Sequence, residues 1–250
     1  MMKKLLFRAD DLGYSEGVNQ GIAKCVSQGL IRSTGVMINM ETAQQGLELL
    51  KGQSVSIGIH CNISNGTPLA DPTKVCSLLN EQGLFKKTKE YAQGEKDIVN
   101  LEEIMLEAEA QYERFVQLTG TKPAYMDGHA VASANFFRGI ELVAKRHGVK
   151  YSPFPHDASK PISIGTSNVF MHAGSTLEVG PMESLHSIVE QAKEDEIHMI
   201  VYHPGFIDAF ILRNSSLTIH RAFETEMLCD PAAKAYLEEQ QIQCITYDEL

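Results

Sequence analysis

The chain has 250 residues, of which 43% are hydrophobic and 22% are charged, a composition typical of a folded globular protein and not of a disordered one. Its formal net charge of −10 argues against binding to nucleic acid or to an anionic membrane surface. The five cysteines are scattered and no apolar run is long enough for a signal peptide or a membrane span, so we expect a soluble protein of the reducing cytoplasm.

The first half of the chain alternates strand-like and helix-like patterns. In chain order they predict a strand over 4–8, a helix capped by Ser15 and ended by Gly29, a strand over 34–39, a helix over 41–50 and a strand over 55–61. Residues 68–95 carry few periodic signals, which indicates an excursion or a lid. A long helix follows, with Asn100 as its cap and Glu103 completing a capping box.

The second half continues in the same way. The patterns predict a strand over 124–127, a helix over 135–147 ended by Gly148, strand-like pieces near Tyr151 and Val169, a helix over 183–193, a strand over 199–202, a helix opened by Asp230 and Pro231, and a strand over 242–246. Repeated strand-then-helix units indicate a single α/β domain over 1–250, with a mostly parallel sheet that is either closed into a barrel or open.

Titratable and metal-binding residue types cluster where these strands end. They are Asp10, Asp11, His60, Asp127, His129 and His203. Parallel strands bring their carboxyl ends to one face of an α/β fold, and this face is where ligands bind. The joint placement therefore predicts a functional site there.

Each of these residues also has a structural interpretation. Asp10 or Asp11 could cap a turn, and His60 could be a neutral core histidine bonded to backbone. Asp127-Gly128 and His203-Pro204-Gly205 are turn-like sequences. Only the shared location favours the functional interpretation.

The residue types in the cluster could hold a metal ion and move protons. One carboxylate and two imidazoles can hold a divalent metal and leave positions open. A second carboxylate can take a proton from water, which suits the adjacent pair Asp10 and Asp11, and His203 could donate a proton to a leaving group.

The motifs that carry these residues resemble a known family. RADDLGYSEGVNQGI at 8–22 closely resembles the opening signature of the YdjC-like carbohydrate deacetylases, which include the chitooligosaccharide deacetylases. The resemblance continues through SIGIHCNI at 56–63, YMDGH at 125–129, YHPGF at 202–206 and TYDEL at 246–250. It therefore spans nearly the whole chain.

This resemblance implies a distorted, TIM-like β/α barrel of the glycoside hydrolase/deacetylase type. It implies hydrolysis of N-acetyl groups from acetylated sugars or short oligosaccharides, phosphorylated ones among them, with a divalent metal usually recorded as magnesium; zinc or another transition metal is the alternative. The implied metal ligands are Asp11, His60 and His129, with Asp10 as the general base and His203 as an acid or charge stabiliser. A homodimer is the assembly that it suggests.

One motif departs from the family pattern. Its histidine-rich string, resembling H-x-D-S-H-x-H-x-H, reads YMDGHAVAS here, so that Val131 and Ser133 replace the later histidines. Asp127 is retained and is a candidate substrate contact, as is Arg213. A metal-dependent phosphoesterase acting on a sugar phosphate and a non-catalytic sugar-binding protein are the alternative functions.

Overall fold

The computed structural model describes residues 2–92, 96–155, 157, 159–176 and 178–250. Its strands are β1 (Lys4–Leu12), β2 (Ser33–Val36), β3 (Ser56–Cys61), β4 (Tyr125–Gly128), β5 (Lys150–Tyr151), β6 (Ile162–Ile164), β7 (Ser167–Ala173), β8 (Ile197–Tyr202) and β9 (Gln243–Ile245). Its helices are α1 (Glu16–Ser27), α2 (Ala43–Leu49), α3 (Thr88–Tyr91), α4 (Leu101–Thr119), α5 (Ala134–His147), α6 (Pro181–Gln191), α7 (Ala209–Asn214), α8 (Ile219–Leu228) and α9 (Pro231–Glu239).

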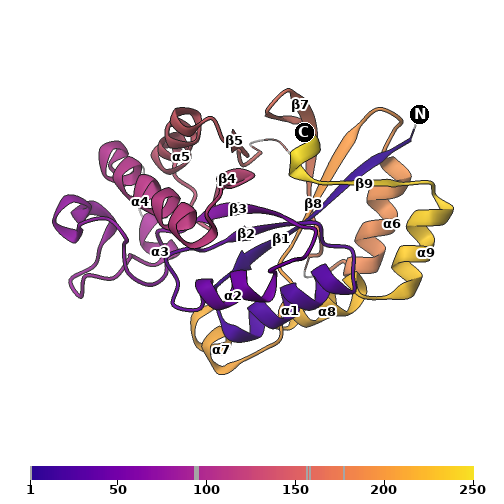
Figure 1. Cartoon of the computed structure of the whole chain (residues 1–250), viewed down its shortest axis with the longest axis horizontal. Coiled ribbons are helices and arrows are strands. Elements are labelled where there is room, and N and C mark those ends of the chain that lie inside the picture. The colour runs from indigo at the N-terminus through magenta and orange to yellow at the C-terminus, as the bar shows by residue number, and fades with distance from the viewer. Residues whose placement is uncertain (1, 93–95, 156, 158, 177) are drawn as a thin grey trace.

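The strands curl into a nearly closed barrel. Their order is β5-β4-β3-β2-β1-β8-β7-β6, with β9 paired to β1, and all pairs are parallel except the antiparallel β6 and β7. In Figure 1 helices surround the strands: α1, α2 and α8 lie below them, α4 and α5 lie beside β3 and β4, and α6 and α9 lie on the right of the view. The structure thus confirms the predicted β/α barrel.

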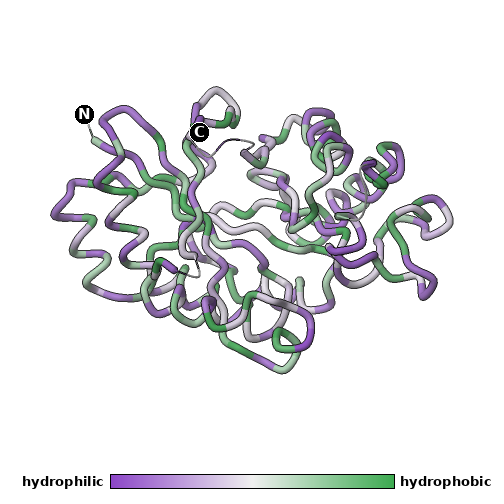
Figure 2. Tube along the Cα trace, turned by 180° about the vertical axis from the view of Figure 1, so that it is seen from behind, coloured by the Kyte–Doolittle hydropathy of each residue, from purple (hydrophilic) through white to green (hydrophobic). Residues whose placement is uncertain are grey.

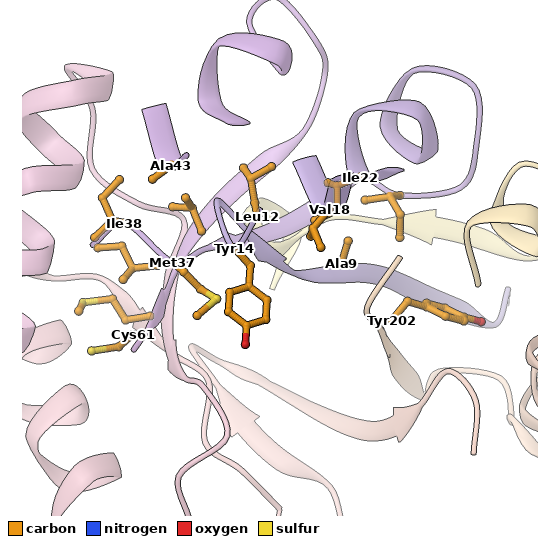
Figure 3. Packing of buried hydrophobic residues seen from close by; sticks show 14 of the residues in the cluster. Ala9, Leu12, Tyr14, Val18, Ile22, Met37, Ile38, Ala43, Cys61 and Tyr202 are labelled. Carbon is orange, nitrogen blue, oxygen red and sulfur yellow. The ribbon is translucent and has the colours of Figure 1, made fainter. Parts of the chain in front are cut away.

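Two hydrophobic cores lie on the two sides of the barrel wall. Because strand residues alternate between faces, Leu5, Phe7 and Ala9 of β1 pack outward against the helices. Figure 3 shows this outer core, in which Val18 and Ile22 of α1 approach β1. The inner core fills the barrel with Leu6, Tyr125, Ile164, Val169, Met199, Ile245 and Tyr247.

Hydropathy along the chain follows this layering. In Figure 2 hydrophobic and hydrophilic residues alternate along the outer helices, as expected for helices with one buried face. Within the described ranges, none of the helices has the length and apolar character needed to cross a lipid bilayer.

Helix ends follow the predicted capping signals, with one correction. The Asn100 side chain accepts hydrogen bonds from the backbone N–H groups of Glu102 and Glu103 and thereby caps α4, and α5 ends at the left-handed Gly148. The predicted capping box is wrong, because the Glu103 carboxylate instead accepts the backbone N–H of Ser77. Glu103 therefore ties α4 to the segment that precedes it.

That segment is the excursion expected over 68–95, of which 93–95 lie outside the described residues. It contains 3-10 turns over Pro72–Lys74 and Cys76–Leu78 and the short helix α3. Val75, Leu78, Phe85 and Tyr91 anchor it in the outer core. A lid function stays a prediction.

Candidate active site

Asp10 and Asp11 diverge because β1 is irregular at this point. The prediction ended this strand at residue 8, but it runs to Leu12, and its pairing with β2 shifts register between Ala9 and Leu12. Asp11 has a φ of 76°, a left-handed conformation that is costly for a residue with a side chain. As a result, Asp10 lines the cavity above the strands, whereas Asp11 contacts His129 and Arg221.

Three side chains from three strand ends converge on one point. Asp11 Oδ1 lies 3.0 Å from His129 Nδ1 and 3.6 Å from His60 Nε2, and the two histidine nitrogens lie 3.1 Å apart. Parallel pairing of β3 with β4 places His60 opposite Asp127, so His129 follows directly at the end of β4. The structure thus brings together the three residues predicted as metal ligands.

Asp127 orients His60. Its Oδ1 lies 2.9 Å from His60 Nδ1, which leaves Nε2 to face Asp11 and His129. Its Oδ2 lies 2.9 Å from Arg8 Nη2, and the same nitrogen donates to Asp10 Oδ2 at 2.7 Å. Arg8 therefore holds two carboxylates of the site from below. A carboxylate on the remote nitrogen of a histidine is the usual support for a metal-binding imidazole.

Arg221 fixes the Asp11 carboxylate. Its Nη2 donates to Asp11 Oδ2 at 2.6 Å, and its Nη1 donates to the His203 backbone carbonyl at 3.3 Å. Arg221 is 1% exposed, so this ion pair is buried. Because Oδ2 is occupied by this contact, Oδ1 is the Asp11 atom that faces the two histidines.

Burial and charge decide the protonation of these groups. Burial opposes ionisation of Asp11, but Arg221 and His129 hold the pKa of this carboxyl well below its usual value. Burial would lower the pKa of His60, but the carboxylates of Asp127 and Asp10 raise it to about 9. The pKa of His129 is lowered, chiefly by burial against the opposing effect of Asp11. Asp11 is thus an anion, and His129 keeps a lone pair, at neutral pH.

The converging atoms fit a divalent metal. Asp11 Oδ1 is buried and accepts no hydrogen bond, although it lies near two imidazole nitrogens. A cation between the three atoms would supply the missing partner. Among the described residues, Asp11, His60 and His129 form one of two overlapping groups whose donor atoms lie close enough together to hold an ion, and Asp10, His60 and Asp127 form the other. In the second group His60 Nδ1 already contacts Asp127, and the carboxylates of Asp10 and Asp127 already contact Arg8. The first group therefore fits a metal better.

A cavity of about 740 Å³ opens above this cluster. Asp10, His60 and Asp127 line it, and so do His203, Leu217, His220 and Glu224. The predicted acid His203 follows β8, and its backbone N–H donates to Glu224 Oε2 at 2.5 Å. Glu224 also accepts from Ser175 Oγ at 2.6 Å, so it joins the ends of β7 and β8.

Not all predicted contacts reach the cavity. Arg213 lies exposed on α7 and is not among the described residues that line it. Asp127 lines the cavity, but both its oxygens are engaged, with His60 and with Arg8. Asp127 therefore supports the His60 ring, and its contact with substrate stays a prediction.

Sequence reasoning missed Arg8, Glu224 and the buried role of Arg221. Arg8 carried a signal, because alternation along β1 places it on the same face as Asp10. Glu224 and Arg221 carried none, since they lie on α8, more than 200 residues from Asp11. Only the folded chain brings them to the site.

Fold and site together define a β/α barrel of the glycoside hydrolase/deacetylase type with a residue cluster that could hold a metal ion. The family model described as YdjC-like protein matches residues 4–239, and the chain belongs to this family. "Carbohydrate deacetylase 2" of Listeria innocua is 31% identical, covering 99% of this chain and 98% of its own. The chitooligosaccharide deacetylase of Escherichia fergusonii is 29% identical, with 99% of each chain covered.

The fold has a solved counterpart. The crystal structure of an Enterococcus faecalis V583 protein named for cellobiose-phosphate cleavage has a TM-score of 0.87 and 22% identity, with 100% of this chain and 99% of that chain covered. This likeness confirms the barrel. The named relatives are carbohydrate deacetylases, and deacetylases are hydrolases. Family membership therefore identifies the chain as a hydrolase of this class.

Proposed function

We propose that the protein is a divalent-metal-dependent hydrolase that removes N-acetyl groups from acetylated sugars. The observation that carries this proposal is the convergence of Asp11 Oδ1, His60 Nε2 and His129 Nδ1 beneath a cavity that Asp10 and His203 also line. The names of the relatives supply the substrate class.

A divalent metal held by Asp11, His60 and His129 would polarise the acetyl carbonyl and make water more acidic. Asp10 is the base: its Oδ2 is fixed by Arg8, and its buried Oδ1 has no hydrogen-bond partner. Oδ1 takes a proton as the water oxygen adds to the acetyl carbon. When the C–N bond breaks, the amine nitrogen takes a proton from His203 or from protonated Asp10, and acetate leaves.

The donor atoms favour a transition metal over magnesium. Mg²⁺ prefers an octahedron of oxygen ligands, whereas two imidazole nitrogens and one carboxylate are typical of zinc and related ions. We therefore propose Zn²⁺ or another first-row transition metal as the ion that gives the highest activity.

The test is acetate release from N-acetylated mono- and oligosaccharides, with and without a 6-phosphate, by protein treated with a chelator and reloaded with single metals. We expect acetate only from reloaded protein, with Zn²⁺, Co²⁺ or Mn²⁺ above Mg²⁺. Phosphate release without acetate would indicate the phosphoesterase instead. Sugar binding without turnover under every metal would indicate a non-catalytic binding protein. Both outcomes would overturn the proposal.

A further inference from the structure

The cavity has an aromatic wall that the proposed chemistry leaves unused. Phe154, in the loop after β5, lines the cavity and is 64% exposed. Its ring lies nearly parallel to that of Phe137 of α5, with centroids 6.1 Å apart and 25° between the planes. Phe137 in turn packs on Phe136 at 5.4 Å. Phe137 thus supports the Phe154 ring, which stays accessible to solvent.

This aromatic pair lies next to the end of β4, which carries Asp127 and His129. Gly128 separates Asp127 from His129, and a Cβ at Gly128 would lie 2.9 Å from the Phe137 ring. The Phe137 ring thus lies between Gly128, next to His129, and the Phe154 ring, and all three residues line the same cavity. Because Asp10, His203 and Phe154 line one cavity and Phe154 is exposed, a substrate with its acetamide at Asp10 and His203 can extend toward the Phe154 ring.

Charges in the cavity favour an uncharged group at this wall. Among its described lining residues, Arg8 is the one arginine or lysine, and its Nη2 is engaged with Asp10 and Asp127. The acidic lining residues are Asp10, Asp127 and Glu224. A dianionic phosphate would find no free lysine or arginine among the described lining residues, and its cationic partners would be the metal and His203 of the proposed reaction centre, whereas the apolar face of a sugar ring can stack on an aromatic ring.

We propose that Phe154, supported by Phe137, is a stacking subsite for a second, unphosphorylated sugar ring, so that oligosaccharides are preferred over monosaccharides. This inference rests on the proposed deacetylase function for the position of the first ring. Phe154 acts on specificity through binding and takes no part in the chemical step.

The chain contains no tryptophan, which allows a direct binding test. Phe154→Trp places a single indole at the proposed subsite and preserves an aromatic face. Phe223→Trp is the matched control, because Phe223 is 52% exposed on α8 and is not among the described cavity-lining residues. Both variants are titrated, without metal and without turnover, with N-acetylglucosamine and with its β-1,4-linked disaccharide.

We expect the disaccharide to change the emission of Phe154→Trp at roughly tenfold lower concentration than the monosaccharide does, and to leave Phe223→Trp unchanged. A tenfold difference corresponds to one stacking contact. An unchanged Phe154→Trp spectrum while calorimetry shows disaccharide binding would overturn the subsite, as would an equal response to both sugars.

Kinetics of Phe154→Ala separate this inference from the proposed function. We expect KM for the disaccharide to rise about tenfold, with kcat and monosaccharide turnover unchanged. If wild-type protein releases no acetate but Phe154→Trp still responds to the disaccharide, the function fails and the subsite stands. If acetate release is normal and Phe154→Ala leaves KM unchanged, or changes only the oligomeric state, the subsite fails and the function stands.

Discussion

Asp10 and Asp11 are adjacent in sequence, yet the irregular end of β1 gives them different surroundings. Asp10 is held by Arg8 and lines the cavity, while Asp11 is held by Arg221 and faces the two histidines. The left-handed backbone at Asp11 is the cost of this separation. Their substitutions should therefore fail in different ways.

Asp11→Asn removes a negative ligand, so we expect metal affinity to fall and excess metal to restore part of the activity. Asp10→Asn should keep the metal and lose roughly 10²-fold or more in turnover, because an amide cannot accept the proton of water. Metal content by atomic absorption, together with acetate release, checks both expectations. Metal loss in Asp10→Asn with retention in Asp11→Asn would require the roles to be exchanged.

His203→Ala should retain metal and lose about 10²- to 10⁴-fold in kcat, the usual contribution of a general acid. The contact of the residue with Glu224 involves the backbone N–H, so the substitution preserves the connection between β8 and α8. His60→Ala is the control that should lose metal as well as activity. Wild-type turnover in His203→Ala would reduce the His-Pro-Gly sequence to a structural turn.

At the scale of elements, α4 and the excursion meet through a buried carboxylate. Glu107 is 0% exposed and accepts the backbone N–H groups of Leu69 and Ala70 and the Gln111 amide. Burial raises its pKa to about 7, although these hydrogen bonds oppose the shift. Because the folded pKa is raised, this group stabilises the fold fully at low pH and loses that contribution as the pH rises through 7.

Glu107→Gln tests this linkage, because glutamine keeps the shape and cannot ionise. We expect the wild-type protein's free energy of unfolding to fall relative to that of the variant between pH 5 and pH 8, by at most about 3 kcal/mol. Urea denaturation at several pH values measures the difference and cancels titrations shared by both proteins. A difference that stays flat over this range would contradict the assignment.

Elements with local end signals were predictable, and elements defined by distant contacts were not. Asn100, Gly148 and Asp230 mark the ends of α4, α5 and α9 by their own side chains or backbone. The sequence patterns did not predict α7, α8 or the antiparallel strand β6. The buried face of α8 carries the polar residues Arg221, Glu224 and Thr225, so the helix has no apolar stripe there that a sequence pattern could show. These side chains are buried because Arg221 contacts Asp11 and Glu224 contacts His203. The convergence of Asp11, His60 and His129 was predictable because strand ends in a parallel sheet meet at one face, whereas the contacts of Arg8 and Arg221 depend on how the strands curl into the barrel.

At the scale of the whole molecule, Tyr247 connects the inner core of the barrel with the site. Tyr247 is fully buried, and its ring stacks on Tyr125 with centroids 3.7 Å apart. Its hydroxyl accepts from Arg8 Nη1 at 2.8 Å and lies 2.9 Å from Ser152 Oγ. Since Arg8 also holds Asp10 and Asp127, the inner core and the site share one hydrogen-bond network.

Two substitutions of Tyr247 should separate packing from hydrogen bonding. Burial raises the pKa of Tyr247 to about 12 against the opposing effect of Arg8, so the hydroxyl is neutral at ordinary pH. The substitutions therefore remove no charge from the core. Tyr247→Phe keeps the stacked ring but leaves one Arg8 N–H without this acceptor, which should cost about 1–3 kcal/mol of the free energy of unfolding. Tyr247→Ala also opens a cavity beside Tyr125 and should cost about 3–5 kcal/mol. Because Arg8 Nη2 still holds Asp10 in Tyr247→Phe, that variant should retain most of its kcat, as urea denaturation and acetate release would show. Equal destabilisation in the two variants would mean that the ring stack contributes nothing to closure of the barrel.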